Sequence, residues 1–197
     1  RRAYPSLAVI PVAADFTQPL GRLPLLPELP VLVFFPGSTI GNFEKSEAVV
    51  LLKSIRDAMP DAHMIIGVDR PKDETVLVAA YDDPAGVTAS FNLNLLQRIN
   101  RSLDANFDLS RFQHKALWNA SESRIEMHLE SRADQTVRIG DTDIRFHKGE
   151  TIHTENSHKY DEEAFAEIAD QGGWQVLDTD TDPDGLFSVV TLQATRD

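Results

Sequence analysis

The chain has 197 residues, of which 42% are hydrophobic and 25% charged, with a formal net charge of -12 and no cysteine. Its length and balance predict a soluble globular protein of one domain, or of one domain with an insertion. The missing cysteines exclude disulfides, thiolate catalysis and cysteine-ligated zinc. Scattered Lys and Arg disfavour nucleic-acid binding, and no apolar run is long enough to cross a membrane, so we expect a cytoplasmic protein.

The first third of the chain predicts part of a parallel sheet. Leu7 to Val12 is an apolar run that indicates a strand, which Pro11 places at an edge or a strand end. The run from Val31 to Phe35 lacks polar alternation, which is typical of a parallel strand buried on both faces. Helical spacing from Glu44 to Met59 and an apolar run from His63 to Val68 complete a strand–helix–strand unit with a right-handed crossover.

The pattern changes in the middle of the chain. Helices are predicted over Glu74 to Tyr81 and over Ala85 to Leu103. From Ala116 to Thr154 the residues alternate as in antiparallel strands, and Gly140-Asp141 indicates a compact hairpin turn. We interpret residues 81–158 as an inserted α+β lobe with one solvent-exposed sheet face.

The end of the chain returns to the first pattern. Asp161 to Asp170 predicts a helix with acidic residues at its start, where the helix dipole favours them. Trp174 to Leu177 and Phe187 to Leu192 predict two strands, joined by a loop from Asp178 to Asp184. We therefore expect residues 1–80 and 159–197 to form one α/β core around the inserted lobe.

The loop after the strand at residues 31–35 is the first candidate site. Ligands of parallel sheets bind beyond the carboxyl ends of the strands. Gly37 lets the backbone approach a ligand, and Ser38, Thr39 and Asn42 add short hydrogen-bonding groups. The alternative is a strand-to-helix turn with a polar cap.

Asp15-Phe16 follows the predicted first strand and could hold an adenine, through the carboxylate and by ring stacking. A helix cap beside a core phenylalanine is the alternative reading. No G-x-G-x-x-G fingerprint of a nucleotide-binding turn occurs in the chain.

Polar residues of the middle segment form a second candidate site. Glu155 and Ser157 share a strand face and offer an acceptor and a donor, which suits the two nitrogens of an imidazole. The alternative is a solvated rim. Tyr81 precedes a Pro-broken joint between lobes, where a cleft is common, although a hinge explains it equally.

Metal and hydrolase chemistry have weaker support. None of the six histidines is paired as in H-E-x-x-H, so no metal site is predicted. Gly37-Ser38 lacks the second glycine of a nucleophile elbow. We nevertheless keep a metal-dependent hydrolase as a rival that chelator sensitivity would reveal.

Six separated motifs carry a family resemblance that runs over nearly the whole chain: Phe35–Phe43, Ala80–Ala89, Phe91–Leu95, Arg98–Arg101, His114–Trp118 and Thr154–Ser157. In this order they resemble the histidine-specific methyltransferases that depend on S-adenosyl-L-methionine (SAM), including those of ergothioneine biosynthesis. The resemblance implies a Rossmann-like sheet with an inserted substrate-binding lobe. It also implies stepwise methylation of the α-amino group of histidine to trimethylhistidine, with SAM as cofactor and a small amino acid as partner.

The resemblance also implies roles for individual residues. Asp15 and Phe16 would contact the adenosine of the cofactor, and Gly37, Ser38 and Thr39 would face the cofactor. For the substrate, Asn42 would hold the amino-acid head, Tyr81 the carboxylate, and Glu155 and Ser157 the imidazole, with Met127 lining the pocket. No catalytic acid or base is implied, because positioning supplies most of the rate of a methyl transfer.

The front of the family pattern has no counterpart in this sequence. The Gly-rich cofactor motif and the acidic ribose-binding position would precede Arg1, so we expect a C-terminal piece that lacks the first strands of the sheet. Two alternatives to histidine methylation stay open: a family member that methylates another amine, and a non-catalytic small-molecule binding fragment.

Overall fold

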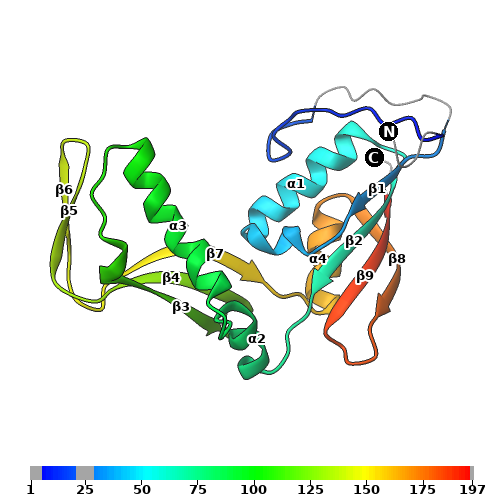
Figure 1. The fold of residues 1–197 in the computed structure, drawn as a ribbon. Coiled ribbons are helices and arrows are strands. Elements are labelled where there is room, and N and C mark those ends of the chain that lie inside the picture. The colour runs from blue at the N-terminus through cyan, green and yellow to red at the C-terminus, as the bar shows by residue number, and fades with distance from the viewer. Residues whose placement is uncertain (1–5, 21–28, 196–197) are drawn as a thin grey trace.

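The structure is a computed structural model that describes residues 6–20 and 29–195. Two lobes are visible in Figure 1, an α/β lobe at the right and a lobe of antiparallel strands and helices at the left. The chain crosses between them at residues 70–73 and again where the strand ending at His158 leads into the α/β lobe. Within the described residues, no helix combines the length and apolarity that a membrane crossing requires.

A four-stranded sheet forms the centre of the α/β lobe. Its order is β1 (Leu32–Phe35), β2 (His63–Asp69), β9 (Phe187–Ala194) and β8 (Trp174–Thr181). β1 and β2 are parallel, whereas β9 is antiparallel to both β2 and β8. The predicted strand–helix–strand unit and the antiparallel closing pair are therefore confirmed. The mixed sheet is the kind that the Rossmann-like prediction requires.

Two helices cover one face of this sheet. α1 (Lys45–Ala58) and α4 (Glu162–Gln171) pack on each other and on the buried face of β2 and β9. The stripe of α1 that begins at Ala48 supplies its buried residues, as the helical spacing predicts. Trp174 is fully buried, and its indole N–H donates to the carbonyl of Leu52 at 2.9 Å, which fixes β8 against α1.

The second lobe is built on a three-stranded antiparallel sheet. Its strands are β3 (Phe112–Asn119), β4 (Arg124–Ser131) and β7 (Thr151–His158), in that order. Helices α2 (Glu74–Tyr81) and α3 (Val87–Ser102) pack against β3 and β4. A hairpin of β5 (Gln135–Ile139) and β6 (Thr142–Phe146) extends from the far end, with Gly140 at positive φ in its turn as predicted.

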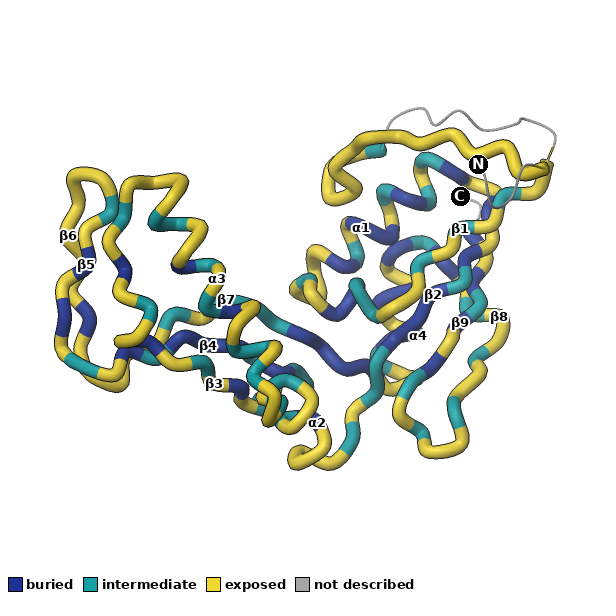
Figure 2. Tube along the Cα trace, viewed as in Figure 1, coloured by how far each residue is buried: buried dark blue, intermediate teal, exposed yellow. Residues whose placement is uncertain are grey.

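Two predictions about the first strands are wrong. Leu7 to Val12 forms no strand, and four of its apolar side chains are exposed. β1 is not buried on both faces, since exposed and partly buried residues alternate along it (Figure 2). Leu32 and Phe34 are 57% and 68% exposed. Both helices of the lobe lie on the opposite face, and none of the described segments pairs with the free edge of β1. An apolar run becomes a buried strand only where neighbours cover it.

A smaller difference concerns β8, which continues to Thr181 through part of the segment that was predicted as a loop. A register shift between Val176 and Asp178 lets the acidic residues of this strand remain exposed while it pairs with β9.

Candidate functional site

The predicted imidazole-binding residues lie on one face of the second lobe. Glu155 pairs with Met127 across β7 and β4, and Ser157 pairs with Ile125. Tyr81, at the end of α2, packs against the small apolar cluster that contains Met127 and Ile125. The structure therefore brings together four of the five predicted substrate residues: Tyr81, Met127, Glu155 and Ser157.

A β-bulge determines which way these residues face. The β4–β7 register shifts between Met127 and His128, so that Met127 opposes Glu155 but His128 opposes His153. Because neighbouring residues of β4 point to opposite faces, Glu155 and His153 are also on opposite faces. Regular alternation would have placed the two on the same face.

Hydrogen bonds join Tyr81 and Ser157 directly. Their hydroxyl oxygens are 2.7 Å apart, and the ammonium of Lys159 donates to both, at 2.8 Å and 2.9 Å. The backbone of Tyr81 is also held, because its carbonyl accepts from Nε2 of His114 at 2.7 Å. Tyr81 is thus held through its hydroxyl by Ser157 and Lys159 and through its backbone by His114.

Glu155 is different, since its carboxylate has no hydrogen-bond or ion-pair partner among the described residues. It is half-buried, and burial raises the pKa of its carboxyl group above the ordinary value. A partly exposed carboxylate can bind water, and a ligand that displaces this water must supply a donor of its own. Among Tyr81, Glu155 and Ser157, Glu155 is therefore the one without a protein partner.

The loop after β1 lies at the junction of the two lobes. Ser38 Oγ accepts from the backbone N–H of Asp69 at 2.9 Å, which places the loop beside the end of β2. Gly41 packs so closely on β7 that an added Cβ would lie 2.7 Å from the carbonyl oxygen of His158. Only glycine permits this approach, which brings the loop next to the strand of Ser157.

The remaining loop residues are more open. Gly37 has a φ of 81° and nothing within 4 Å of the position that a Cβ would take, and Thr39 is partly buried in a short 3-10 helix. Asn42, at the end of that helix, is exposed. The short helix that ends at Asn42 contacts β7, the strand of Glu155 and Ser157, but no hydrogen bond is found between Asn42 and the other four predicted substrate residues.

Asp15 and Phe16 lie next to this loop. The ring of Phe16 meets those of Phe35 and Phe43 edge to face, at centroid distances of 6.1 Å and 6.3 Å. Oδ1 of Asp15 accepts from the backbone and the hydroxyl of Thr17, and these bonds lower the pKa of Asp15. Phe16 thus gathers with the loop at the carboxyl end of β1, while Asp15 closes a turn of its own.

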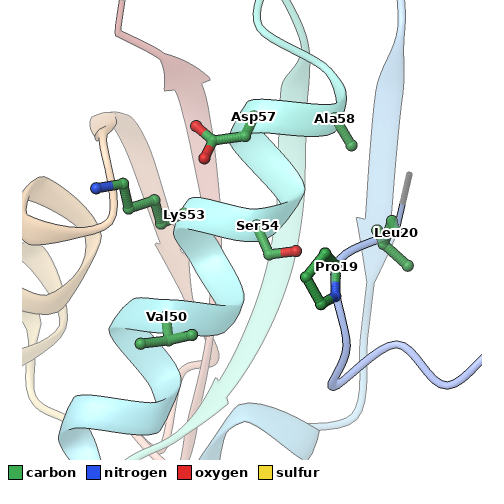
Figure 3. A pocket seen from close by; sticks show the side chains of 7 residues that line it. All are labelled: Pro19, Leu20, Val50, Lys53, Ser54, Asp57 and Ala58. Carbon is green, nitrogen blue, oxygen red and sulfur yellow. The ribbon is translucent and has the colours of Figure 1, made fainter. Parts of the chain in front are cut away.

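Other hollows and clusters do not coincide with these residues. A pocket on the outer side of α1 lies between Pro19, Leu20 and five residues of that helix (Figure 3). None of the predicted site residues lines it. Its open position and ordinary side chains give it no chemistry of its own.

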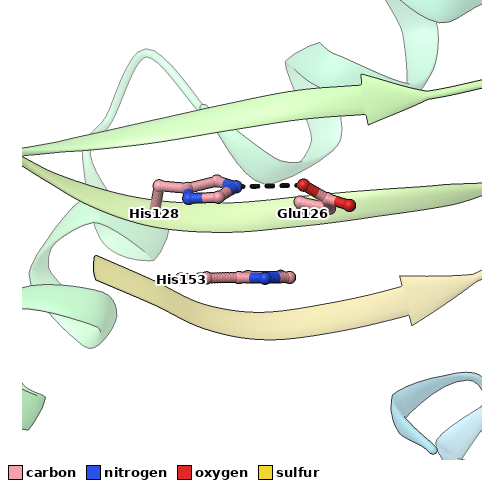
Figure 4. Close-up of side chains that lie close together, drawn as sticks. All are labelled: Glu126, His128 and His153. Carbon is pink, nitrogen blue, oxygen red and sulfur yellow. Dashed lines mark hydrogen bonds and ion pairs between the residues drawn. The ribbon is translucent and has the colours of Figure 1, made fainter. Parts of the chain in front are cut away.

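One cluster of Glu126, His128 and His153 has ligand atoms close enough for a cation (Figure 4). The His128 and His153 rings stack at 4.5 Å with an angle of 18°, so their nitrogens point along parallel planes instead of converging. Glu126 is already bound by Arg124, and its pKa is about 2, because hydrogen bonds from Asn119, Arg124 and His128 outweigh the effect of burial. This arrangement favours an ion-paired stack over a metal site.

The mixed α/β sheet agrees with a SAM-dependent methyltransferase, and a comparison with protein families establishes that class. The family model described as histidine-specific, SAM-dependent methyltransferase matches residues 1–194. The chain belongs to this family.

Individual relatives agree with the family assignment. The chain is 42% identical over 190 residues to the histidine N-alpha-methyltransferase of Mycolicibacterium smegmatis, and the aligned region covers 94% of this chain and 58% of that protein. It is 42% identical over 176 residues to the protein of the same name from Mycobacterium tuberculosis, covering 87% and 54%. It is 27% identical over 177 residues to the L-tryptophan methyltransferase of Psilocybe serbica, covering 88% and 49%. The chain thus spans about half the length of the curated relatives that it matches.

Sequence reasoning missed three residues that organise the site: Glu44, Asp69 and Lys159. Glu44 begins α1 and binds Arg124 and Asn156 of the second lobe. Asp69 ends β2 and accepts from Lys159 at 2.7 Å. Lys159 follows Ser157 at the strand spacing of two, and this spacing was the one signal from which it could have been found.

Proposed function

We propose that the full-length protein methylates the α-amino group of L-histidine with SAM as methyl donor, stepwise to trimethylhistidine. The unpartnered carboxylate of Glu155, on the same face as the hydroxyl of Ser157, carries the choice of substrate. A neutral imidazole has one N–H donor and one nitrogen acceptor, which this pair complements. Family membership supplies the reaction class.

The residues at the carboxyl end of β1 fit one part of SAM. The exposed Phe16 ring and the open space at Gly37 leave room for a planar base, and Oδ2 of Asp15 accepts no hydrogen bond from a described residue. Phe16, Asp15 and the loop of Gly37, Ser38 and Thr39 would therefore hold its adenosine end. When bound, SAM supplies an electrophilic methyl group.

The chain's own residues then have the task of positioning. Tyr81 would bind the carboxylate of the substrate, Glu155 and Ser157 its ring, and Asn42 its amino-acid head, with Met127 beside the ring. Methyl transfer needs an unprotonated amine in line with the donor, and holding both reactants in place supplies most of the acceleration. The buried polar groups would also reject amino acids without ring nitrogens, because these leave Glu155 and Ser157 unpaired.

Mass spectrometry of L-histidine incubated with SAM and the full-length protein tests the proposal. We expect products that are heavier by one, two and three methyl groups. Transfer to another amine in a panel that includes L-tryptophan, with none to histidine, would keep the reaction class and reject the substrate. No transfer to any amine would favour a non-catalytic binding protein.

A further inference from the structure

Lys159 is the most completely buried charged residue of the second candidate site. It follows directly after β7, and its side chain is 0% exposed. Its ammonium lies 2.7 Å from Oδ2 of Asp69, 2.8 Å from the Tyr81 hydroxyl and 2.9 Å from the Ser157 hydroxyl. An ammonium has three donors and no acceptor, so these three oxygens use all of its protons.

The protons of the two hydroxyls can therefore be counted. Both oxygens accept from Lys159, and each hydroxyl keeps its own proton to donate. The oxygens of Tyr81 and Ser157 are 2.7 Å apart, so one of these protons lies between them. The other proton has no acceptor within this cluster of Lys159, Asp69, Tyr81 and Ser157, so it is available to a ligand.

A ligand with acceptor groups can use both protons. If it opens the bond between Tyr81 and Ser157, each hydroxyl donates to the ligand while Lys159 continues to bind both oxygens. Glu155, on the same strand face as Ser157, adds an acceptor without a partner. The face then offers two donors and one acceptor, which matches a carboxylate together with a neutral imidazole.

We propose that Lys159 is a positioning residue that sets substrate specificity, because it fixes the hydroxyls of Tyr81 and Ser157 as donors toward a substrate with a carboxylate and an unprotonated ring nitrogen. This inference rests on the proposed function and deepens it. Lys159 touches no substrate atom itself. Its ammonium binds one lone pair of each oxygen, which orients both hydroxyls so that their own protons are left to donate.

Asp69 keeps the ammonium in place and also provides a control. Its second carboxylate oxygen binds Lys72, which makes no contact with Tyr81 or Ser157. Burial acts to raise the pKa of Asp69, but the hydrogen bonds from Lys159 and Lys72 outweigh it and hold the pKa below the ordinary value. Removal of Lys72 thus perturbs the same carboxylate and leaves both hydroxyls bound to Lys159.

The test compares Lys159→Met with Lys72→Met in the full-length protein. Dissociation constants are measured by calorimetry for L-histidine and for L-2-thienylalanine, whose five-membered ring has no nitrogen. The preference of the wild type for histidine should shrink by about tenfold or more in Lys159→Met, the worth of one charge-assisted hydrogen bond. Lys72→Met should keep the wild-type ratio.

A double-mutant cycle separates positioning from mere structural support. In a Ser157→Ala background, Lys159→Met should change the ratio by less than about twofold, because the hydroxyl that would bind the ring is gone and Tyr81 would bind the carboxylate that both ligands share. If Lys159→Met does not unfold cooperatively, the double variant Asp69→Asn/Lys159→Met takes its place in the same measurements. The double variant removes both members of the ion pair, so no buried charge is left unpaired.

The outcomes distinguish this inference from the proposed function. A wild type that does not prefer histidine to thienylalanine overturns the proposed function and this inference with it. A wild type that prefers histidine, together with a folded Lys159 variant that keeps the same ratio, overturns the role of Lys159 alone. An equal effect of Lys159→Met with and without Ser157 would also reject it.

Discussion

The two regions that form the candidate site are built differently. At the carboxyl end of β1, the predicted cofactor residues are exposed or only partly buried, and they contribute an aromatic ring, small side chains and open backbone. On the second lobe, the predicted substrate residues are half-buried or buried, and Tyr81 and Ser157 are tied to Lys159. Stacking on a base needs room and a flat surface, whereas recognition of an imidazole needs directional hydrogen bonds with no water competing for them.

A few contacts couple these two regions. Asp69 binds Ser38 of the loop through its backbone and Lys159 of the second lobe through its side chain. Glu44 joins the start of α1 to Arg124 and Asn156. If the proposed function is right, these polar contacts, together with the packing of Gly41 on β7, would set the relative position of cofactor and substrate.

The largest expected effect comes from breaking this junction with Asp69→Asn. Lys159 would keep its buried charge without a charged partner, and we expect a loss of about 3 kcal/mol in the free energy of unfolding. Since the pKa of Asp69 is lowered in the folded state, its contribution is present above the ordinary value of 3.8 and is lost as the pH falls below it. Urea unfolding of the wild type and the variant at pH 7 and near pH 3 measures both quantities, and equal stability of the two proteins at pH 7 would reject the role of Asp69.

Glu155→Ala should affect the substrate region alone. Because this carboxylate has no protein partner to lose, stability should stay the same or rise, while kcat/KM for histidine falls by about 100-fold, the worth of a strong charge-assisted hydrogen bond. Steady-state kinetics and thermal unfolding check the two halves of the prediction. Glu163→Ala, at an exposed position of α4, is the matched control. A cooperative transition lost in Glu155→Ala would mean that the residue is structural.

A third change sharpens the comparison at the contact between the loop and β7. Gly41→Ala forces a Cβ toward the carbonyl of His158, and such overpacking costs about 2 kcal/mol. Gly86→Ala, at a φ of 70° with open space around it, adds only about 1 kcal/mol of backbone strain. Unfolding and histidine turnover of both variants should show that only Gly41→Ala impairs turnover. Equal turnover in the two variants would contradict a functional contact.

The smallest effect is expected from metal removal. Dialysis against EDTA should leave methyl transfer to histidine unchanged, and so should His153→Ala, because the stacked rings of His128 and His153 do not converge on a cation. Methyl transfer lost with EDTA and restored by a transition metal would contradict this reading and show that the protein needs a metal.

The sequence predicted those parts of the fold that depend on local patterns. The period of apolar residues located α1, α2, α3 and α4, and the glycine turn located the β5–β6 hairpin. It failed for Leu7 to Val12 and for the exposed face of β1, because burial depends on which segments lie alongside, and no local pattern contains that information.

The site was predictable to a similar degree. Two-residue spacing placed Glu155 and Ser157 on one face, and motif resemblance added Tyr81 and Met127. The bulge that separates Glu155 from His153 has no clear sequence signal, nor does the meeting of Lys159 with Asp69, 90 residues apart in sequence. These features arise from pairing and tertiary contact, and the roles of all predicted site residues remain predictions.

Nitrogen-15 NMR of ring-labelled L-histidine bound to the full-length protein tests most directly whether the second lobe reads a neutral imidazole. With Glu155 as acceptor and Ser157 as donor, the bound ring should show two separate resonances, one from a protonated and one from an unprotonated nitrogen. Resonances of the bound ring that stay averaged by exchange, as in free histidine, or that show both nitrogens protonated, would contradict recognition of a neutral imidazole by Glu155 and Ser157.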